Sequence, residues 1–97
     1  MKHKYKEGDI VLVILDHDYL ISIGFEKVNG GGYHKKNTTT ILQEMAKFGT
    51  RIATIERLTT KNNCHFLEES LKFHYPLDIV LPLNTPMSKY LYATTKN

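Results

Sequence analysis

The feature that most constrains this sequence is an uninterrupted run of six apolar residues, from Ile10 to Leu15. Most of these residues are β-branched, and the Gly8-Asp9 pair ahead of them is a turn signal, so the run predicts a strand over residues 5–15. Apolar and polar residues do not alternate within it. We therefore expect this strand to be buried on both faces.

The rest of the chain alternates short apolar segments with turns. A second apolar stretch covers residues 19–25 and leads to the turn Asn29-Gly30-Gly31-Gly32. Strand patterns return after residue 50, and the strands expected there are 51–58, 64–69, 71–75 and 79–83. The first two are expected to pair as a hairpin, and Pro76-Leu77-Asp78 is expected to form a single tight helical turn.

One short helix is predicted, over residues 41–48. Thr40 with Gln43 fits a capping box, and a glycine follows the segment. The apolar residues at helical spacing are Ile41, Met45 and Phe48. We expect these three to form a buried face that covers one end of a barrel.

Length and composition indicate a single domain. The chain has 97 residues, of which 41% are apolar and 24% charged. Residues 1–83 are assigned to this domain, and residues 84–97 to a C-terminal tail that is either frayed or a short helix starting at Thr85-Pro86. Several short strands without a long amphipathic helix predict a mainly β fold, a small barrel or a curled sheet.

Four segments occur in a recognisable order: the glycine-aspartate turn before an apolar strand, the helix Met45-Ala46-Lys47-Phe48-Gly49, the strand 51–55, and Phe66-Leu67-Glu68-Glu69 before an aromatic strand. Over residues 5–83 this order resembles small SH3-like barrel proteins of phages and mobile elements, most of which have no assigned function. The resemblance implies an SH3-like barrel of about five strands. The tryptophan often found in the aromatic strand is missing, so the resemblance does not imply the proline-rich peptide groove of eukaryotic SH3 modules.

The sequence predicts no catalytic site and no cofactor. Asp16-His17-Asp18 and Cys64-His65 bring together residue types that enzymes use, but neighbours on a strand point to opposite faces. Cys64, the only cysteine, is expected to be buried in the core. We therefore expect a protein that is not an enzyme.

No metal site is predicted either. The histidines are spread along the chain without close spacing: His3, His17, His34, His65 and His74. A hairpin closed near Ser70 would make His65 and His74 cross-strand neighbours. Two ligands are an incomplete site, and the favoured interpretation is a pair of solvent-facing strand histidines.

Nothing in the sequence predicts a membrane partner. The apolar run is too short for a signal peptide or a membrane span, and a single cysteine suits a reducing compartment. We expect a cytoplasmic protein, in the host cytoplasm if the chain is viral.

The candidate binding surface combines positive charge with a glycine-rich loop. The net charge is +3 and the pI is near 9.0. The loop from Gly30 to Asn37 carries an aromatic ring, an imidazole and two ammonium groups, which can contact phosphates and stack on a base. The complete set of candidates is Lys2, Lys4, Lys6, Tyr33, His34, Lys35, Lys36 and Arg51.

Two main functions remain open, and a structural component of a virion, which would co-purify with particles, is a third. We favour a phage or mobile-element accessory protein that binds a host or viral protein and inhibits host defence or the transcription machinery. The alternative is a small nucleic-acid-binding barrel that uses the basic N-terminal arm and the Gly30–Asn37 loop. A steep dependence of binding on salt would distinguish the second function from the first.

Overall fold

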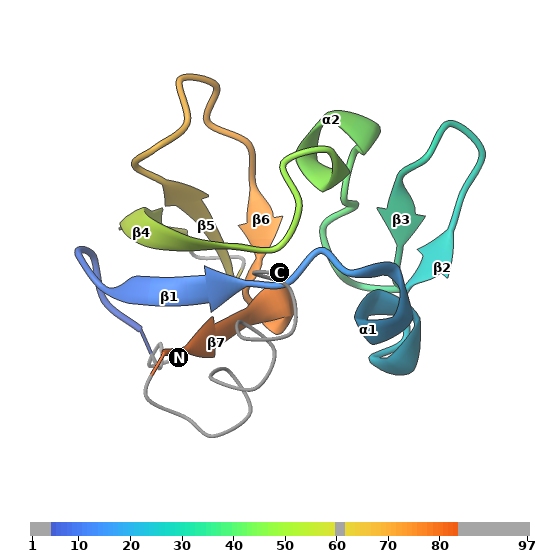
Figure 1. The fold of residues 1–97 in the computed structure, drawn as a ribbon, viewed down its shortest axis with the longest axis horizontal. Helices are drawn as coiled ribbons and strands as arrows, with labels where there is room; N and C mark the ends of the chain where they lie inside the picture. The colour runs from blue at the N-terminus through green and yellow to red at the C-terminus, as the bar shows by residue number, and fades with distance from the viewer. Residues whose placement is uncertain (1–4, 60–61, 84–97) are drawn as a thin grey trace.

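The structure, a computed structural model, describes residues 5–59 and 62–83 (Figure 1). Its elements follow in this order: β1 (Ile10–Val13), α1 (His17–Ser22), β2 (Glu26–Lys27), β3 (Tyr33–His34), α2 (Gln43–Ala46), β4 (Arg51–Leu58), β5 (Asn63–Phe66), β6 (Tyr75–Pro76), the 3-10 turn η1 (Leu77–Ile79) and β7 (Val80–Pro82). Five strands form an antiparallel sheet in the order β6-β5-β4-β1-β7, and β2 pairs with β3. The prediction of a mainly β fold is confirmed.

The strand β1 lies inside the sheet, between β4 and β7. Val11 and Val13 belong to the main core, whereas Leu12 is fully buried outside that cluster. The predicted burial of both faces is therefore confirmed. The strand is shorter than the predicted 5–15, because Gly8 turns the chain at φ +95° and the Leu15 N–H leaves the sheet to donate to Thr50 Oγ1 at 2.9 Å.

The helix α1 was not predicted, and the expectation of a single helix is wrong. Asp16 is its N-cap, with the carboxylate accepting a hydrogen bond from the Tyr19 N–H at 3.4 Å. Leu20 packs into the core while Ile21 is exposed. The chain leaves the helix at Gly24, whose φ of +104° is a conformation that glycine adopts readily.

The helix α2 is a single turn, so the predicted range 41–48 is too long at both ends. Its N-cap is Leu42, whose N–H donates to Met45 Sδ at 3.3 Å, and the predicted Thr40 capping box is not used. Ile41 is buried but pairs with Tyr33 as an isolated bridge. Phe48 lies beyond the helix end and is 49% exposed, so it is not on the buried face as predicted.

The predicted glycine turn is confirmed as the tip of the β2–β3 hairpin. The Val28 N–H donates to the Gly32 carbonyl at 3.0 Å, and the Gly31 N–H donates back to the Val28 carbonyl at 3.2 Å. Gly32 is buried against the next segment, where a Cβ atom would stand 2.6 Å from the Ile41 carbonyl oxygen. That close approach allows only glycine there.

The second half of the sheet follows the prediction more closely. β4 and β5 form the expected hairpin, with a register shift between Ile55 and Arg57 that marks a β-bulge. The predicted strand 71–75 is wrong in extent, since only its last residue pairs with β5, through Cys64 and Tyr75. The expected helical turn is η1, and β7 returns to pair with β1.

In the chain, α1, the β2–β3 hairpin and α2 are inserted between β1 and β4, which are neighbours in the sheet (Figure 1). The core includes residues of both the sheet and this inserted segment. Its largest fully buried side chains include Tyr75, Phe25 and Phe66. Within the described residues no helix is long and apolar enough to cross a membrane. The predicted tail, 84–97, and its helix lie outside the described residues.

Candidate binding surface

The candidate residues predicted from charge lie at several places in the fold. Lys2 and Lys4 are outside the described residues, and Lys6 is exposed in the turn before β1. Arg51 begins β4, and the remaining candidates lie on or just after β3. The structure therefore does not gather the described candidates into one patch.

Two loop candidates are held by distant residues. Tyr33 is only 6% exposed, and its hydroxyl forms a 2.9 Å hydrogen bond with His17 Nδ1. Lys35 forms a 3.0 Å ion pair with Asp78 in η1, and its ammonium lies over the Phe25 ring. These contacts fasten the hairpin to η1 and to α1. His34 and Lys36 are the loop candidates that remain exposed.

Arg51 is part of a partly buried ionic network. Its guanidinium pairs with the carboxylate of Glu69, whose side chain is 4% exposed. The Tyr75 hydroxyl donates to the same carboxylate at 3.0 Å, and burial, as the largest cause, raises the pKa of Tyr75 to about 12. Opposite charge and a hydrogen bond thus compensate for the burial of Glu69.

An apolar patch lies next to this network, and we define it as the exposed Phe48 and Leu71 with the half-buried Phe73. The rings of Phe48 and Phe73 meet edge to face with centroids 6.3 Å apart. Leu71, two residues before Phe73, is 66% exposed. The Arg51 guanidinium lies 5.1 Å from the centroid of the Phe48 ring, so a cation borders the patch.

The apolar patch was missed by sequence reasoning for an identifiable reason. Phe48 fits the helical spacing of Ile41 and Met45, which suggested burial. The helix, however, ends before it. No signal in the sequence indicated this, because Gly49 fits a helix that ends at Phe48 equally well.

A polar cleft of about 520 Å³, which we call the bulge cleft, includes residues at the register shift of β4 in its lining. Its lining residues are Glu7, Glu56, Arg57, His65 and Lys72. Lys72 and Glu56 form a 2.9 Å ion pair across it. At its edge the imidazole rings of His65 and His74 lie 4.5 Å apart, so the predicted cross-strand neighbours are confirmed.

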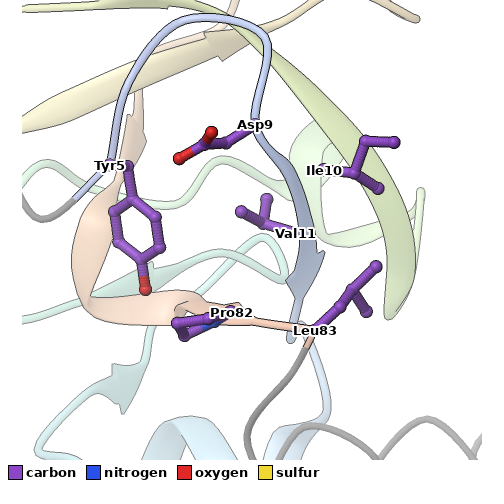
Figure 2. Close-up of a pocket in the computed structure, with 6 residues that line it drawn as sticks. All are labelled: Tyr5, Asp9, Ile10, Val11, Pro82 and Leu83. Atoms are coloured by element: carbon purple, nitrogen blue, oxygen red, sulfur yellow. The ribbon is translucent and has the colours of Figure 1, made fainter.

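A second pocket, of about 290 Å³, lies between the turn before β1 and β7 (Figure 2). Figure 2 shows the Tyr5 ring reaching toward Pro82. The Tyr5 hydroxyl donates to the Val80 carbonyl at 3.0 Å, and burial raises the pKa of this tyrosine. The contact attaches the start of the described chain to the last strand.

The catalytic arrangements that the sequence allowed us to consider are not assembled. Asp16 caps α1, and His17 bonds to Tyr33 instead. Cys64 is fully buried, which raises the pKa of its thiol to about 12. Among the described residues, no group of three or more His, Cys, Asp or Glu side chains is arranged to hold a metal ion.

Comparisons of the chain with protein-family models, with curated proteins and with solved structures find no match.

Proposed function

We propose that this chain is a non-catalytic SH3-like barrel that binds a protein partner through the apolar patch. The strand order supports the barrel. β1, β4, β5 and β6 are successive antiparallel neighbours once the inserted segment is set aside, and β7 returns to β1 after η1. A sheet with this connectivity closes into a small barrel when it curls.

The exposure of the apolar patch is the observation that carries the binding function. Phe48 exposes 49% and Leu71 66% of their surfaces, which is a cost for large apolar side chains unless a partner covers them. Two aromatic rings in contact with each other, an arginine over one of them and an exposed leucine close by in the sequence are residue types that protein interfaces favour. Within the patch, the Phe48 ring also packs on the Arg51 guanidinium, which is itself held by Glu69.

The resemblance to proteins of phages and mobile elements supports a host or viral protein as the partner. In this proposal the chain is an accessory protein that occupies a surface of the host defence or transcription machinery. Its partner presents apolar side chains that cover Phe48, Leu71 and Phe73. The burial of Cys64, with its raised thiol pKa, supports a role without nucleophilic catalysis.

The contacts of the glycine-rich loop favour a protein over a nucleic acid as partner. Stacking on a base needs an accessible ring, yet Tyr33 is in the core. Charge neutralisation of phosphates needs available cations, yet Lys35 is paired with Asp78. The loop therefore has fewer accessible groups that could contact a phosphate backbone than its sequence indicates.

The first prediction tests the patch directly with the double variant Phe48→Ser/Leu71→Ser. Capture from a nuclease-treated host lysate by the intact chain is expected to return one stoichiometric protein. The double variant is expected to bind that protein at least about 30-fold more weakly, since buried anchor side chains at interfaces contribute about 2 kcal/mol or more. Affinity is measured by surface plasmon resonance with the purified partner.

The matched control is Ile21→Ser on α1, which removes an apolar side chain of similar exposure outside the patch. It is expected to leave affinity unchanged, and circular dichroism checks that all variants fold. Equal binding by the double variant and the wild type would refute the patch. A partner that is captured from untreated lysate but not from nuclease-treated lysate would support the nucleic-acid alternative instead.

A further inference from the structure

The outer face of the sheet, which points away from the core, exposes large apolar side chains on three neighbouring strands. The direction of each strand's side chains is fixed by a core residue, and these are Val11 in β1, Ala53 in β4 and Phe66 in β5. Side chains alternate between the two faces along a strand, so the adjacent Ile10, Ile52 and Leu67 point outward. Ile10 and Leu67 are each 57% exposed and Ile52 is 38% exposed.

Two of these side chains form a row across the sheet with Thr54 between them. The register pairs Ile10 with Thr54, and on the other side of β4 the Leu67 N–H donates to the Thr54 carbonyl at 2.9 Å. Neighbouring strands lie about 4.8 Å apart, so the row is about 10 Å wide. The solvated face of an antiparallel sheet normally carries polar side chains. An apolar row on that face indicates contact with another surface.

Unpaired charges of both signs lie at one end of this row. Glu7 comes three residues before Ile10 and Arg57 three residues after Thr54, and the two strands are antiparallel, so both charges are at the same end. Both line the bulge cleft, where their exposed side chains form neither an ion pair nor a hydrogen bond among the described residues. One free cation and one free anion make this end of the face complementary in charge to a copy of itself.

We propose that a second copy of this chain docks on the outer face, and that the copies are related by a two-fold axis running along the strands between β1 and β4. This axis exchanges β1 with β4 across the interface. Glu7 of each copy then meets Arg57 of the other, and Ile10 meets Thr54. Such self-complementary contacts are what a two-fold interface requires.

The expected dimer is weak and reversible. Three short strands from each copy give a small interface, and interfaces below about 1,200 Å² are typical of transient association. The dimer uses none of the residues that define the apolar patch, so it is independent of the proposed protein-binding function.

The test is sedimentation equilibrium of the intact chain from micromolar to millimolar concentration. The mass is expected to rise from 11.2 kDa toward twice that value as the concentration increases. Ile10→Thr keeps a β-branched side chain and is expected to weaken dimerisation at least about tenfold, because a symmetric interface loses the same apolar contact twice. Val28→Thr is the matched control, since Val28 is exposed beside β2 and outside this face. It is expected to dimerise like the wild type.

Charge reversal tests the two-fold arrangement. Glu7→Arg and Arg57→Glu are each expected to weaken the dimer at least about tenfold, because like charges then face each other across the axis. The double variant Glu7→Arg/Arg57→Glu is expected to restore dimerisation, since the two positions exchange their charges.

Circular dichroism checks that every variant folds, and Ile10→Thr decides the matter if the charge variants do not. A wild type that stays monomeric at every concentration would overturn the proposal. Equal dimerisation by the wild type and Ile10→Thr, or a folded double charge variant that does not recover the dimer, would overturn it as well.

Discussion

Among single residues, Glu69 depends most on partners from other segments. Its buried carboxylate is paired with Arg51 at the start of β4 and accepts from the Tyr75 hydroxyl in β6. The Arg51 guanidinium also lies over the rings of Phe66 and Tyr75, so the same cation packs against the core. Removing the cation would leave a carboxylate with little access to water.

We therefore predict that Arg51→Met lowers the free energy of unfolding by about 3 kcal/mol, because it leaves a buried charge unpaired. Adding Glu69→Met in the same chain is expected to recover part of this loss, since no charge then remains buried. Urea denaturation measures both. Arg57→Met, at an exposed arginine of the same strand, serves as the control. Losses that simply add in the double variant would contradict the pairing.

Glu68 has a different role from its buried neighbour. Its carboxylate accepts hydrogen bonds from the Thr54 N–H at 2.9 and 3.1 Å and so replaces a strand carbonyl at the end of β5. Burial alone would raise the pKa of Glu68, but these hydrogen bonds outweigh it and lower the pKa from its ordinary value of 4.5.

A lower pKa in the folded state means that Glu68 stabilises the fold above pH 4.5 and that this stabilisation is lost as the pH falls through the folded-state pKa. We expect Glu68→Gln to flatten this part of the stability profile. Thermal unfolding between pH 6 and 2 measures it, with Glu44→Gln on α2 as the exposed control. An unchanged profile in Glu68→Gln would show that other carboxylates dominate acid unfolding.

At the scale of elements, local patterns predicted the pieces whose partners are close in sequence. The β4–β5 hairpin and η1 were predicted because each closes within a few residues. α1 was missed because its apolar residues do not alternate or recur clearly, and Asp16 was considered only as part of the Asp16-His17-Asp18 cluster and not as an N-cap. Apolar and polar residues alternate over the predicted strand 71–75, as in a strand with one exposed face. Of these residues, however, only Tyr75 is paired, with Cys64 of β5.

The β2–β3 hairpin gives a prediction at this scale. Gly32→Ala is expected to lower stability by about 2–3 kcal/mol, because the new Cβ atom would clash with the Ile41 backbone oxygen. In Gly30→Ala the new Cβ atom would have no neighbour within contact distance. Its expected loss of stability, about 1 kcal/mol, therefore comes only from backbone strain at φ +95°. Urea midpoints compare the two. Equal losses would mean that the turn conformation, and not the close approach, makes glycine necessary.

For the whole molecule, the sequence predicted which residues are buried better than it predicted which residues form an accessible binding surface. Burial of β1 on both faces was predicted from the uninterrupted apolar run, and Val11, Leu12 and Val13 are buried although Ile10 is 57% exposed. The candidate surface was harder to predict, since Tyr33 and Lys35 are engaged by His17 and Asp78 through contacts between distant segments. The cross-strand pair His65 and His74 was foreseen, but the hydrogen bond between His65 and the Phe73 carbonyl required the three-dimensional structure.

The pairing of β1 with β7 has a consequence for how the chain reaches its native state. Val13 lies opposite Val80, so β1 is paired on its second edge with residues that are almost the last of the described chain. This edge stays unpaired until those residues are present. Contacts between such distant positions carry a large loop-closure entropy and slow the folding reaction. During synthesis, an apolar strand is therefore exposed until β7 leaves the ribosome, and the growing chain is most vulnerable to aggregation in that interval.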